Sequence, residues 1–248
     1  MVSFQSEVLF HIGSFKITNT LIDTLLIDAV LIALCIAVSR NIKIIPGIFQ
    51  NAVEMVIQMF YEITESVAQE KVKKIFPYFM SFFIFILLAN WSGLLPGVNS
   101  IGFFEEGHLV PLLRSSTSDL NVTLGLALVS AFATHIMSIR TIGLKDYIGR
   151  FFSFNPINLF IGILEIISEI TKIISLSFRL FGNIFAGEVV LLTVSSLFAL
   201  LFPLPFLLLE VIVGLVQALV FSMLTMSFMA ILTTPHHDSS TNTNSVKY

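Results

Sequence analysis

The sequence predicts an all-α, polytopic membrane protein with five transmembrane helices, one of them very long and tilted, and one amphipathic helix at the membrane surface. Of the 248 residues, 56% are hydrophobic and 12% are charged, whereas soluble domains carry about twice that charged fraction. The mean hydropathy is +0.94. Apolar runs of about 20 residues or more recur along the chain, which is the length that crosses a hydrocarbon core as a helix.

These runs divide one membrane domain into elements. In chain order we expect an outer N-terminal segment (1–19), span 1 (20–38), a surface helix (47–69), span 2 (77–96), an outer loop (97–119), span 3 (120–139), span 4 (157–200), span 5 (206–232) and an inner tail (233–248). The outer loop and the tail are polar, so we expect both to be loosely ordered. The N-terminal segment lacks the pattern of a signal peptide, so span 1 should act as its own insertion signal.

The surface helix differs from the spans because its apolar residues recur at every third or fourth position. They are Ile48, Ala52, Met55, Met59, Ile63 and Val67. Glutamates and glutamines occupy the other faces, and Pro46 marks the start of the helix. This pattern predicts an amphipathic helix that lies on the inner surface or docks on partner helices there.

Span 4 is too long for an upright helix. At 1.5 Å per residue, 157–200 would extend about 66 Å. Two spans would need a tight turn between Ser175 and Arg179, where there is no proline and no glycine before Gly182. We therefore expect one long helix that is strongly tilted or curved.

Lysines and arginines orient these spans. With the N-terminus outside, nine fall in the inner connections and two in the outer ones. The inner residues are Arg40, Lys43, Lys71, Lys73, Lys74, Arg140, Lys145, Arg150 and Lys247, and the outer ones are Lys16 and Arg114. This positive-inside bias predicts an outer N-terminus and an inner C-terminus.

Span 4 carries a stripe of polar residues at helical spacing. It consists of Glu165, Glu169, Lys172, Arg179 and Asn183. Charges at this depth are energetically costly, so each is a candidate functional residue. The first three could instead simply pair with one another, and Arg179 could form a structural ion pair with Glu188 or Glu210.

Arg179 lies near the middle of span 4, and its guanidinium keeps its proton. Glu188 follows nine residues later, or about 13 Å outward along the helix. Glu210 lies seven positions before Gln217 on the same face of span 5. Because Glu165 and Glu169 lie in the inner half, carboxyl groups flank the central arginine on both sides. This arrangement is typical of two aqueous half-channels separated by a fixed positive charge.

Other function classes find little support. No basic block indicates a nucleic acid as partner, and no glycine loop cradles a phosphate. Cys35 is interpreted as apolar filler, and His236 and His237 in the tail as solvated residues. His135 is interpreted as an interfacial or packed side chain. We expect no cofactor and no metal.

Five segments carry a resemblance to a known family. They are IPGIFQNAVEMVI (45–57), NWSGLLPG (90–97), SSTSDLNVTLGLAL (115–128), SLSFRLFGNIFAGE (175–188) and VQALVFSMLT (216–225). In this order they closely resemble the motifs of the a subunits of F-type ATP synthases, and the resemblance extends over nearly the whole chain.

The resemblance implies a role for each polar residue. Arg179 matches the essential arginine that faces the ring of c subunits. The outer half-channel would comprise Asn183, Glu188, Glu210 and Gln217, with Asp119 and Asn121 near its entrance. The inner half-channel would comprise Glu165, with Glu169 and Lys172 in less defined roles.

The implied function is proton translocation by a non-catalytic stator subunit. A proton would enter past Glu188 and Glu210, ride the c-ring for nearly one turn, and leave past Glu165. The implied partners are the c-ring, the b subunits of the peripheral stalk, the soluble F1 sector indirectly, and the lipid bilayer. Carboxyl groups at both outer positions favour a bacterial plasma membrane over an organellar one. A secondary transporter and a non-transporting assembly subunit remain the alternatives.

Overall fold

The computed structural model describes residues 8–12, 15–40, 42–95, 102–105, 108–111, 113–151, 156–197 and 203–234. Helices dominate this part of the chain, and the predicted all-α polytopic class is confirmed. Most of the expected inner tail, including His236 and His237, lies outside the described residues.

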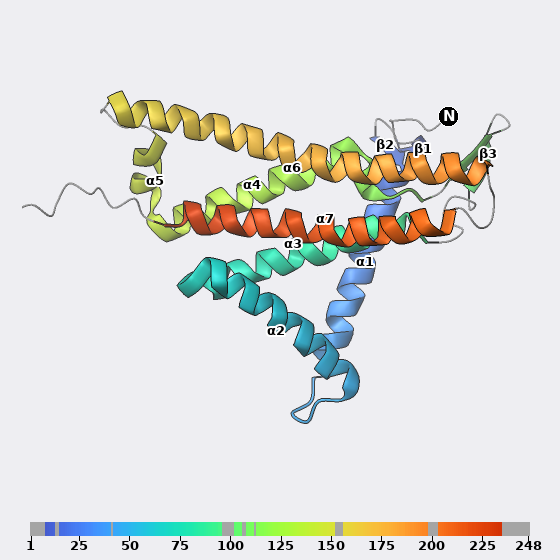
Figure 1. The fold of residues 1–248 in the computed structure, drawn as a ribbon, viewed down its shortest axis with the longest axis horizontal. Coiled ribbons are helices and arrows are strands. Elements are labelled where there is room, and N and C mark those ends of the chain that lie inside the picture. The colour runs from blue at the N-terminus through green and yellow to red at the C-terminus, as the bar shows by residue number, and fades with distance from the viewer. Residues whose placement is uncertain are drawn as a thin grey trace, which may run out of the picture.

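Seven α-helices follow one another among the described residues (Figure 1). They are α1 (Asn19–Arg40), α2 (Ile48–Ala68), α3 (Val72–Ser92), α4 (Leu120–Ile142), α5 (Leu144–Phe151), α6 (Pro156–Leu197) and α7 (Pro203–Leu232). The short helix α5 was not predicted, because its eight residues are too few and too polar to stand out as a membrane span.

Four helical stretches of the described residues are long and apolar enough to cross a membrane. They are Asn19–Arg40, Ile48–Ser92, Leu120–Ile142 and Pro203–Leu232. The second joins the expected surface helix to span 2, because only the 3₁₀ turn η1 (Gln69–Lys71) separates α2 from α3. The helix α6 is not among the four, so its crossing stays a prediction.

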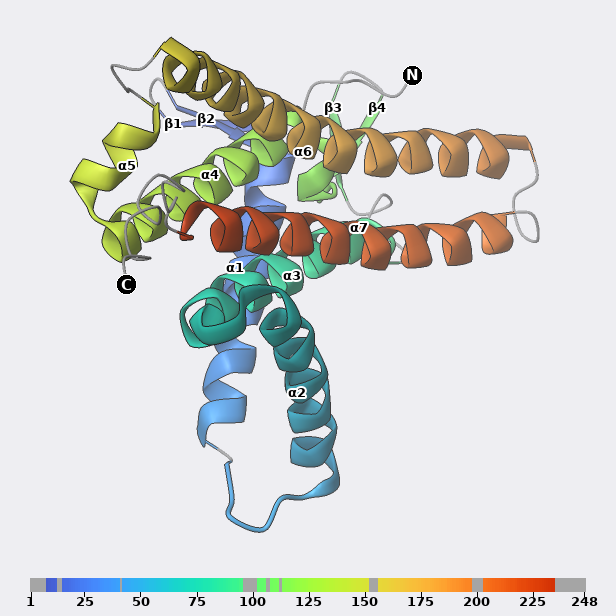
Figure 2. The same ribbon diagram turned by 60° about the vertical axis from the view of Figure 1, so that its left-hand side comes forward.

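One unbroken helix of 42 residues occupies the region of span 4, rather than two shorter ones. At 1.5 Å per residue, α6 is about 63 Å long. It lies beside α7, whereas α1 runs crosswise to both in each view (Figures 1 and 2). Consequently no single membrane normal can lie along all three helices.

The core lies where α3 packs against α7. Its largest fully buried apolar side chains are Ile75, Phe79, Ile86, Leu180, Phe221, Met226, Met229 and Leu232. Two polar side chains of α3 also tie it to the backbone of α7. Asn90 Nδ2 donates to the carbonyl oxygen of Gly214 at 2.9 Å, and Trp91 Nε1 donates to that of Val211 at 3.1 Å. Such bonds satisfy groups that lipid could not.

The end of the outer loop is more ordered than the sequence indicated. In this loop, strands β3 (Gly102–Glu105) and β4 (His108–Pro111) form an antiparallel hairpin. In the N-terminal segment, β1 (Val8–Ile12) and β2 (Phe15–Thr18) form another. The following 3₁₀ turn η3 (Ser116–Ser118) is buried. The expectation of a loosely ordered loop is therefore wrong for residues 114–119, all of which are buried.

A carboxylate in α1 explains this order. Asp23 is 2% exposed and accepts hydrogen bonds from Ser92 Oγ at 2.9 Å, from the Ser116 backbone N–H at 2.9 Å and from Ser116 Oγ at 2.6 Å. Hydrogen bonds to a charged group are stronger than neutral ones. Asp23 thus joins α1, the end of α3 and η3 at one point.

The packing of α3 on α7 predicts an effect at Gly214. A Cβ atom there would lie 3.1 Å from Asn90 Cβ, so Gly214→Leu should overpack the contact and destabilise the protein by about 1–3 kcal/mol. The matched control is Gly125→Leu in α4, because nothing lies within 4 Å of a Cβ atom at that glycine. Thermal unfolding of the purified protein in detergent measures both changes. Equal unfolding temperatures for the two variants would contradict this account.

Candidate functional site

Helix α7 packs closely against α6 at a glycine. A Cβ atom on Gly187 would lie 2.6 Å from the carboxyl carbon of Glu210, well inside van der Waals contact. Four residues earlier on α6, Asn183 Nδ2 donates to Gln217 Oε1 at 2.9 Å. The absent side chain and the hydrogen bond together fix the register of the two antiparallel helices.

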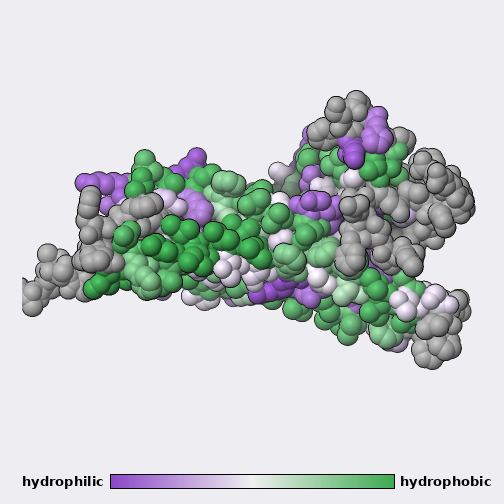
Figure 3. Space-filling view, turned by 90° about the horizontal axis from the view of Figure 1, so that it is seen from above, coloured by the Kyte–Doolittle hydropathy of each residue, from purple (hydrophilic) through white to green (hydrophobic). Residues whose placement is uncertain are grey.

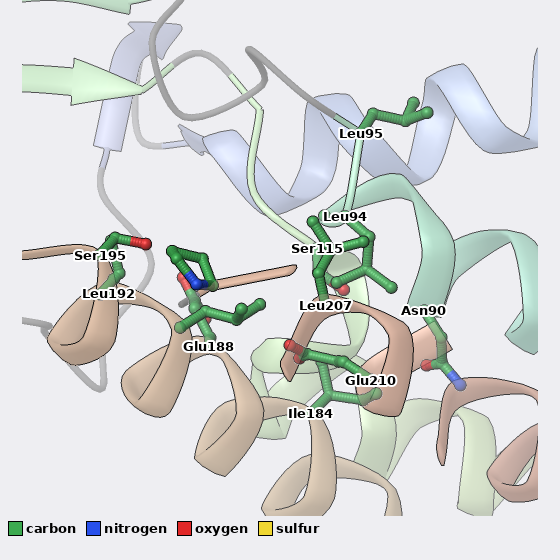
Figure 4. Close-up of a pocket in the computed structure, with 13 residues that line it drawn as sticks. Asn90, Leu94, Leu95, Ser115, Ile184, Glu188, Leu192, Ser195, Leu207 and Glu210 are labelled. Carbon is green, nitrogen blue, oxygen red and sulfur yellow. The ribbon is translucent and has the colours of Figure 1, made fainter. Parts of the chain in front are cut away.

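A cavity of about 200 Å³ opens beside this contact. It is lined by Asn90, Gly93, Leu94, Leu95, Ser115, Ile184, Glu188, Leu191, Leu192, Ser195, Pro203, Leu207 and Glu210. Figure 4 shows Glu188 on α6 and Glu210 on α7, with Asn90 and Ser115 on the side of α3 and η3. The cavity therefore unites two predicted site residues with a wall that the sequence analysis did not foresee.

Glu188 is held by an arginine from the outer loop. Arg114 Nε lies 3.3 Å from Glu188 Oε1, and Arg114 Nη2 donates to Glu188 Oε2 at 3.3 Å. The two side chains are 8% and 19% exposed. In the sequence, Arg114 served only to orient the spans. No local pattern links it to Glu188, because the two residues lie 74 positions apart.

Glu210 lacks such a cation. The residue is 5% exposed, and among the described residues its Oε2 atom has no hydrogen-bond partner. A buried carboxyl oxygen without a partner is energetically costly. Because Glu210 lines the cavity, water or a proton is the simplest partner for this oxygen.

Arg179 occupies the other side of the helix contact. It is exposed, and its Nη2 atom donates to Ser175 Oγ at 3.4 Å. No ion pair between described residues includes Arg179, so the alternative of a structural pair with Glu188 or Glu210 is wrong. A cation that cannot lose its proton is thus left facing outward from the fold.

Arg179 stands at one end of an open groove of about 420 Å³ between α6 and α7. The groove is lined by Leu164, Ile167, Ser168, Thr171, Lys172, Ser175, Leu176, Arg179, Leu224 and Phe228. Large apolar side chains such as Ile167, Ile174 and Phe178 are also exposed along α6. Figure 3, seen from the side on which α6 lies, shows an extensive hydrophobic surface interrupted by hydrophilic residues. This face is suited to lipid or to a partner helix.

The predicted inner residues are partly paired. Lys172 Nζ donates to Glu169 Oε1 at 2.8 Å and lies 4.5 Å from the centre of the Phe228 ring. Pairing between Glu169 and Lys172, one of the alternatives left open, is therefore present. Glu165 lies one turn before Glu169 and is partly exposed. His135 Nε2 also lies 3.8 Å from Glu169 Oε2.

Asp119 and Asn121 lie outside the cavity lining. Asp119 is the N-cap of α4, where its Oδ1 accepts from the Asn121 backbone N–H at 2.8 Å and its Oδ2 accepts from Thr20 Oγ1 at 3.2 Å. An aspartate in this position satisfies an unpaired N–H of the first helical turn. Asn121 is exposed. Their roles near a channel entrance stay predictions.

Metal binding has no candidate in the described part of the chain, where no group of three or more histidine, cysteine, aspartate or glutamate residues could hold an ion. The arrangement instead offers two separate pockets along α6, each with polar side chains in a largely apolar lining, and the exposed Arg179 lies at the end of one of them. Carboxyl groups line or adjoin both pockets.

Known proteins resemble this chain over almost its full length. The family model described as ATP synthase A chain matches residues 21–230. The "ATP synthase subunit a" of Moorella thermoacetica is 32% identical over 230 residues, covering 93% of this chain and 97% of that protein. The "ATP synthase subunit a 2" of Pelobacter propionicus is 34% identical, covering 91% of each chain. The protein of the same description from Bradyrhizobium sp. is 35% identical, covering 90% of this chain and 92% of that protein.

The ion pair in the cavity predicts a coupled effect of two substitutions. Arg114→Gln should leave a largely buried carboxylate without its cation and destabilise the protein by roughly 3 kcal/mol. The double variant Arg114→Gln, Glu188→Gln should recover most of this loss, because two amides can hydrogen-bond to each other. Thermal unfolding in detergent gives the coupling as a double-mutant cycle. Additive losses would rule out a direct pair.

Proposed function

Because the chain belongs to the ATP synthase A chain family, we propose that it is the stator subunit that passes protons between two half-channels and a rotating ring of c subunits. Family membership gives the chain a role in the membrane sector of an ATP synthase. We further propose how individual residues perform this role. Conversion of nucleotides is assigned to a separate soluble sector, so this subunit is non-catalytic.

The observation that carries the proposal is the division of polar space along α6. The cavity at Glu188 and Glu210 begins at Ile184, whereas the groove ends at Arg179. The two share no lining residue. Two separate pockets let protons reach the middle of the membrane from each side without forming a continuous pore.

Arg179 would act as the barrier between the pockets. A protonated carboxyl group of the ring is neutral and can turn through lipid, whereas a carboxylate in lipid is costly. When a ring carboxyl group reaches Arg179, the permanent cation favours its ionised form, and the proton leaves. The same cation repels a free proton and so prevents direct crossing. Its exposure and the lack of a carboxylate partner within the described chain support this role.

The outer cavity would supply the ring. A proton from the outer side reaches Glu210 in the cavity, next to Glu188 and its partner Arg114. Asn183 and Gln217 continue the polar path toward Arg179, because their side chains are hydrogen-bonded to each other at the contact between α6 and α7. From there the proton neutralises a ring carboxylate.

The inner groove would receive the proton after nearly one turn of the ring. Its polar lining runs from Ser175 through Thr171 and Lys172 to Ser168, and Glu165 and Glu169 lie beside it on α6. These carboxyl groups would accept protons and release them to the inner side. Because α6 runs crosswise to α1, the two pockets would be offset sideways as well as in depth.

The exposed apolar surfaces of the protein suit assembly with a c-ring and a peripheral stalk. The exposed apolar residues of α6 would face the ring, and those of α2, such as Phe49 and Met55, would contact lipid or the b subunits. The F1 sector would be reached only indirectly. We place the protein in the plasma membrane of a bacterium, because the relatives compared above are bacterial, with the N-terminus outside and the C-terminus in the cytoplasm.

Replacement of Arg179 tests the barrier. Arg179→Ala should abolish ATP-driven proton pumping in inverted membrane vesicles, while the complex still assembles. The control Arg40→Ala removes an exposed cation at the end of α1 and should leave pumping intact. Normal pumping by the Arg179→Ala complex would overturn the proposed function. Loss of assembly in that variant would favour a purely structural subunit.

Access from the two sides of the membrane tests the half-channels. On a Cys35→Ala background, a cysteine at Ser195 in the cavity should react with a charged thiol reagent only from the outer side. A cysteine at Thr171 in the groove should react only from the inner side. Right-side-out and inverted vesicles provide the two directions. Reaction of both cysteines from one side would contradict two opposed half-channels.

A further inference from the structure

A histidine meets the inner polar residues at the end of the bundle, where α4 ends and α5 leads to α6 (Figure 1). His135 of α4 stands between Tyr147 of α5 and Glu169 of α6. From the sequence, His135 is interpreted as an interfacial or packed side chain. The contacts on both of its ring nitrogens indicate a further role for this side chain.

Each ring nitrogen of His135 faces a group that exchanges protons. Nδ1 lies 2.9 Å from Tyr147 Oη, and Nε2 lies 3.8 Å from Glu169 Oε2. The tyrosine hydroxyl can donate to Nδ1 or accept from it, so this contact survives whether the imidazole is neutral or charged. The side chain is 26% exposed, which leaves it in reach of water.

We propose that His135 is a proton-relay residue of the inner half-channel, taking protons from Glu169 and passing them to water at the inner surface. This inference rests on the proposed function. Imidazole gains and loses a proton near neutral pH more readily than any other side-chain group. The cluster joins the groove to the end of the bundle, because Lys172 lines the groove and also pairs with Glu169.

The step is a simple transfer. The Oε2–H bond of the protonated Glu169 breaks, and an N–H bond forms at His135 Nε2. Acceptance at Nε2 requires the neutral tautomer that carries its proton on Nδ1, where it donates to Tyr147 Oη. After the ring turns from Glu169, the Nε2–H bond breaks, this proton passes to water, and the same tautomer is restored. Glu169 is left as a carboxylate beside Lys172, ready for the next proton. The 3.8 Å separation must shorten for the transfer, which a rotation of either partly exposed side chain allows.

The groups around His135 favour this direction of transfer. From α5 it faces Tyr147, and from α6 it faces Glu169, with Lys172 on the far side of that carboxylate. Once His135 is charged, Glu169 lies between two cations, which stabilises the carboxylate and discourages return of the proton. The Lys172 ammonium group is held near Glu169, because it also lies over the Phe228 ring.

A structural role would look similar in a static view, because the bond from Tyr147 to His135 also ties α5 to α4. A variant that keeps the hydrogen bond to Tyr147 but cannot exchange protons distinguishes the relay role from the structural role. His135→Gln does this, since an amide can still bond to Tyr147. His135→Ala opens a space that free imidazole could occupy. His11→Gln, at an exposed histidine in β1, is the matched control.

The experiment measures passive proton flux as a function of pH in vesicles prepared with the whole complex, after the soluble sector has been stripped from them. His135→Gln should lower the flux about tenfold and flatten its dependence on pH. Added imidazole should restore flux to His135→Ala. The control should behave as the unsubstituted protein.

An unchanged rate and pH profile in His135→Gln would overturn the inference, as would a lower rate with an unchanged profile and no rescue of His135→Ala. If Arg179→Ala abolishes pumping while His135→Gln has no effect, only the relay fails and the proposed function stands. If Arg179→Ala pumps normally, the proposed function itself fails.

Discussion

The structure of the site depends on one contact, the approach of α7 to α6 at Gly187. With no side chain at that position, the Glu210 carboxyl group can lie against the backbone of α6. The hydrogen bond between Asn183 and Gln217 then follows from the antiparallel register. Arg179 and Glu188 fall on opposite sides of this contact because they lie on opposite faces of the same helix. A larger residue at 187 would move all of these groups together.

The remaining charges divide into satisfied and unsatisfied groups. Asp23 accepts three hydrogen bonds, Glu188 pairs with Arg114, and Glu169 pairs with Lys172. Among the described residues, Arg179 has no carboxylate partner and the Glu210 Oε2 atom has no hydrogen bond. A fold usually satisfies its buried polar groups. The buried Glu210 oxygen therefore indicates where water or a proton would complete the structure, and the exposed Arg179 indicates where another subunit would.

The sequence was most informative for features that neighbouring residues determine, such as the extent of each helix. The apolar runs predicted the helices, and the lack of proline or glycine before Gly182 favoured one continuous α6. It was least informative where partners are far apart in the chain. Arg114 lies 74 residues from Glu188, and neither the hairpins nor the meeting of His135 with Tyr147 follows from a helical repeat. The outward distances inferred from the sequence were counted along each helix, although span 4 was expected to be tilted. The crosswise course of α1 means that steps along α6 measure sideways distance as well as depth.

The burial of Asp23 has a consequence for how the protein is made. Its partners Ser92 and Ser116 lie 69 and 93 residues further along the chain. When α1 leaves the ribosome and enters the bilayer, neither partner has been synthesised. The Asp23 carboxyl group must therefore enter the bilayer either hydrated or protonated. Helix α1 can therefore be locked in place only after α3 and η3 have been synthesised and have reached it.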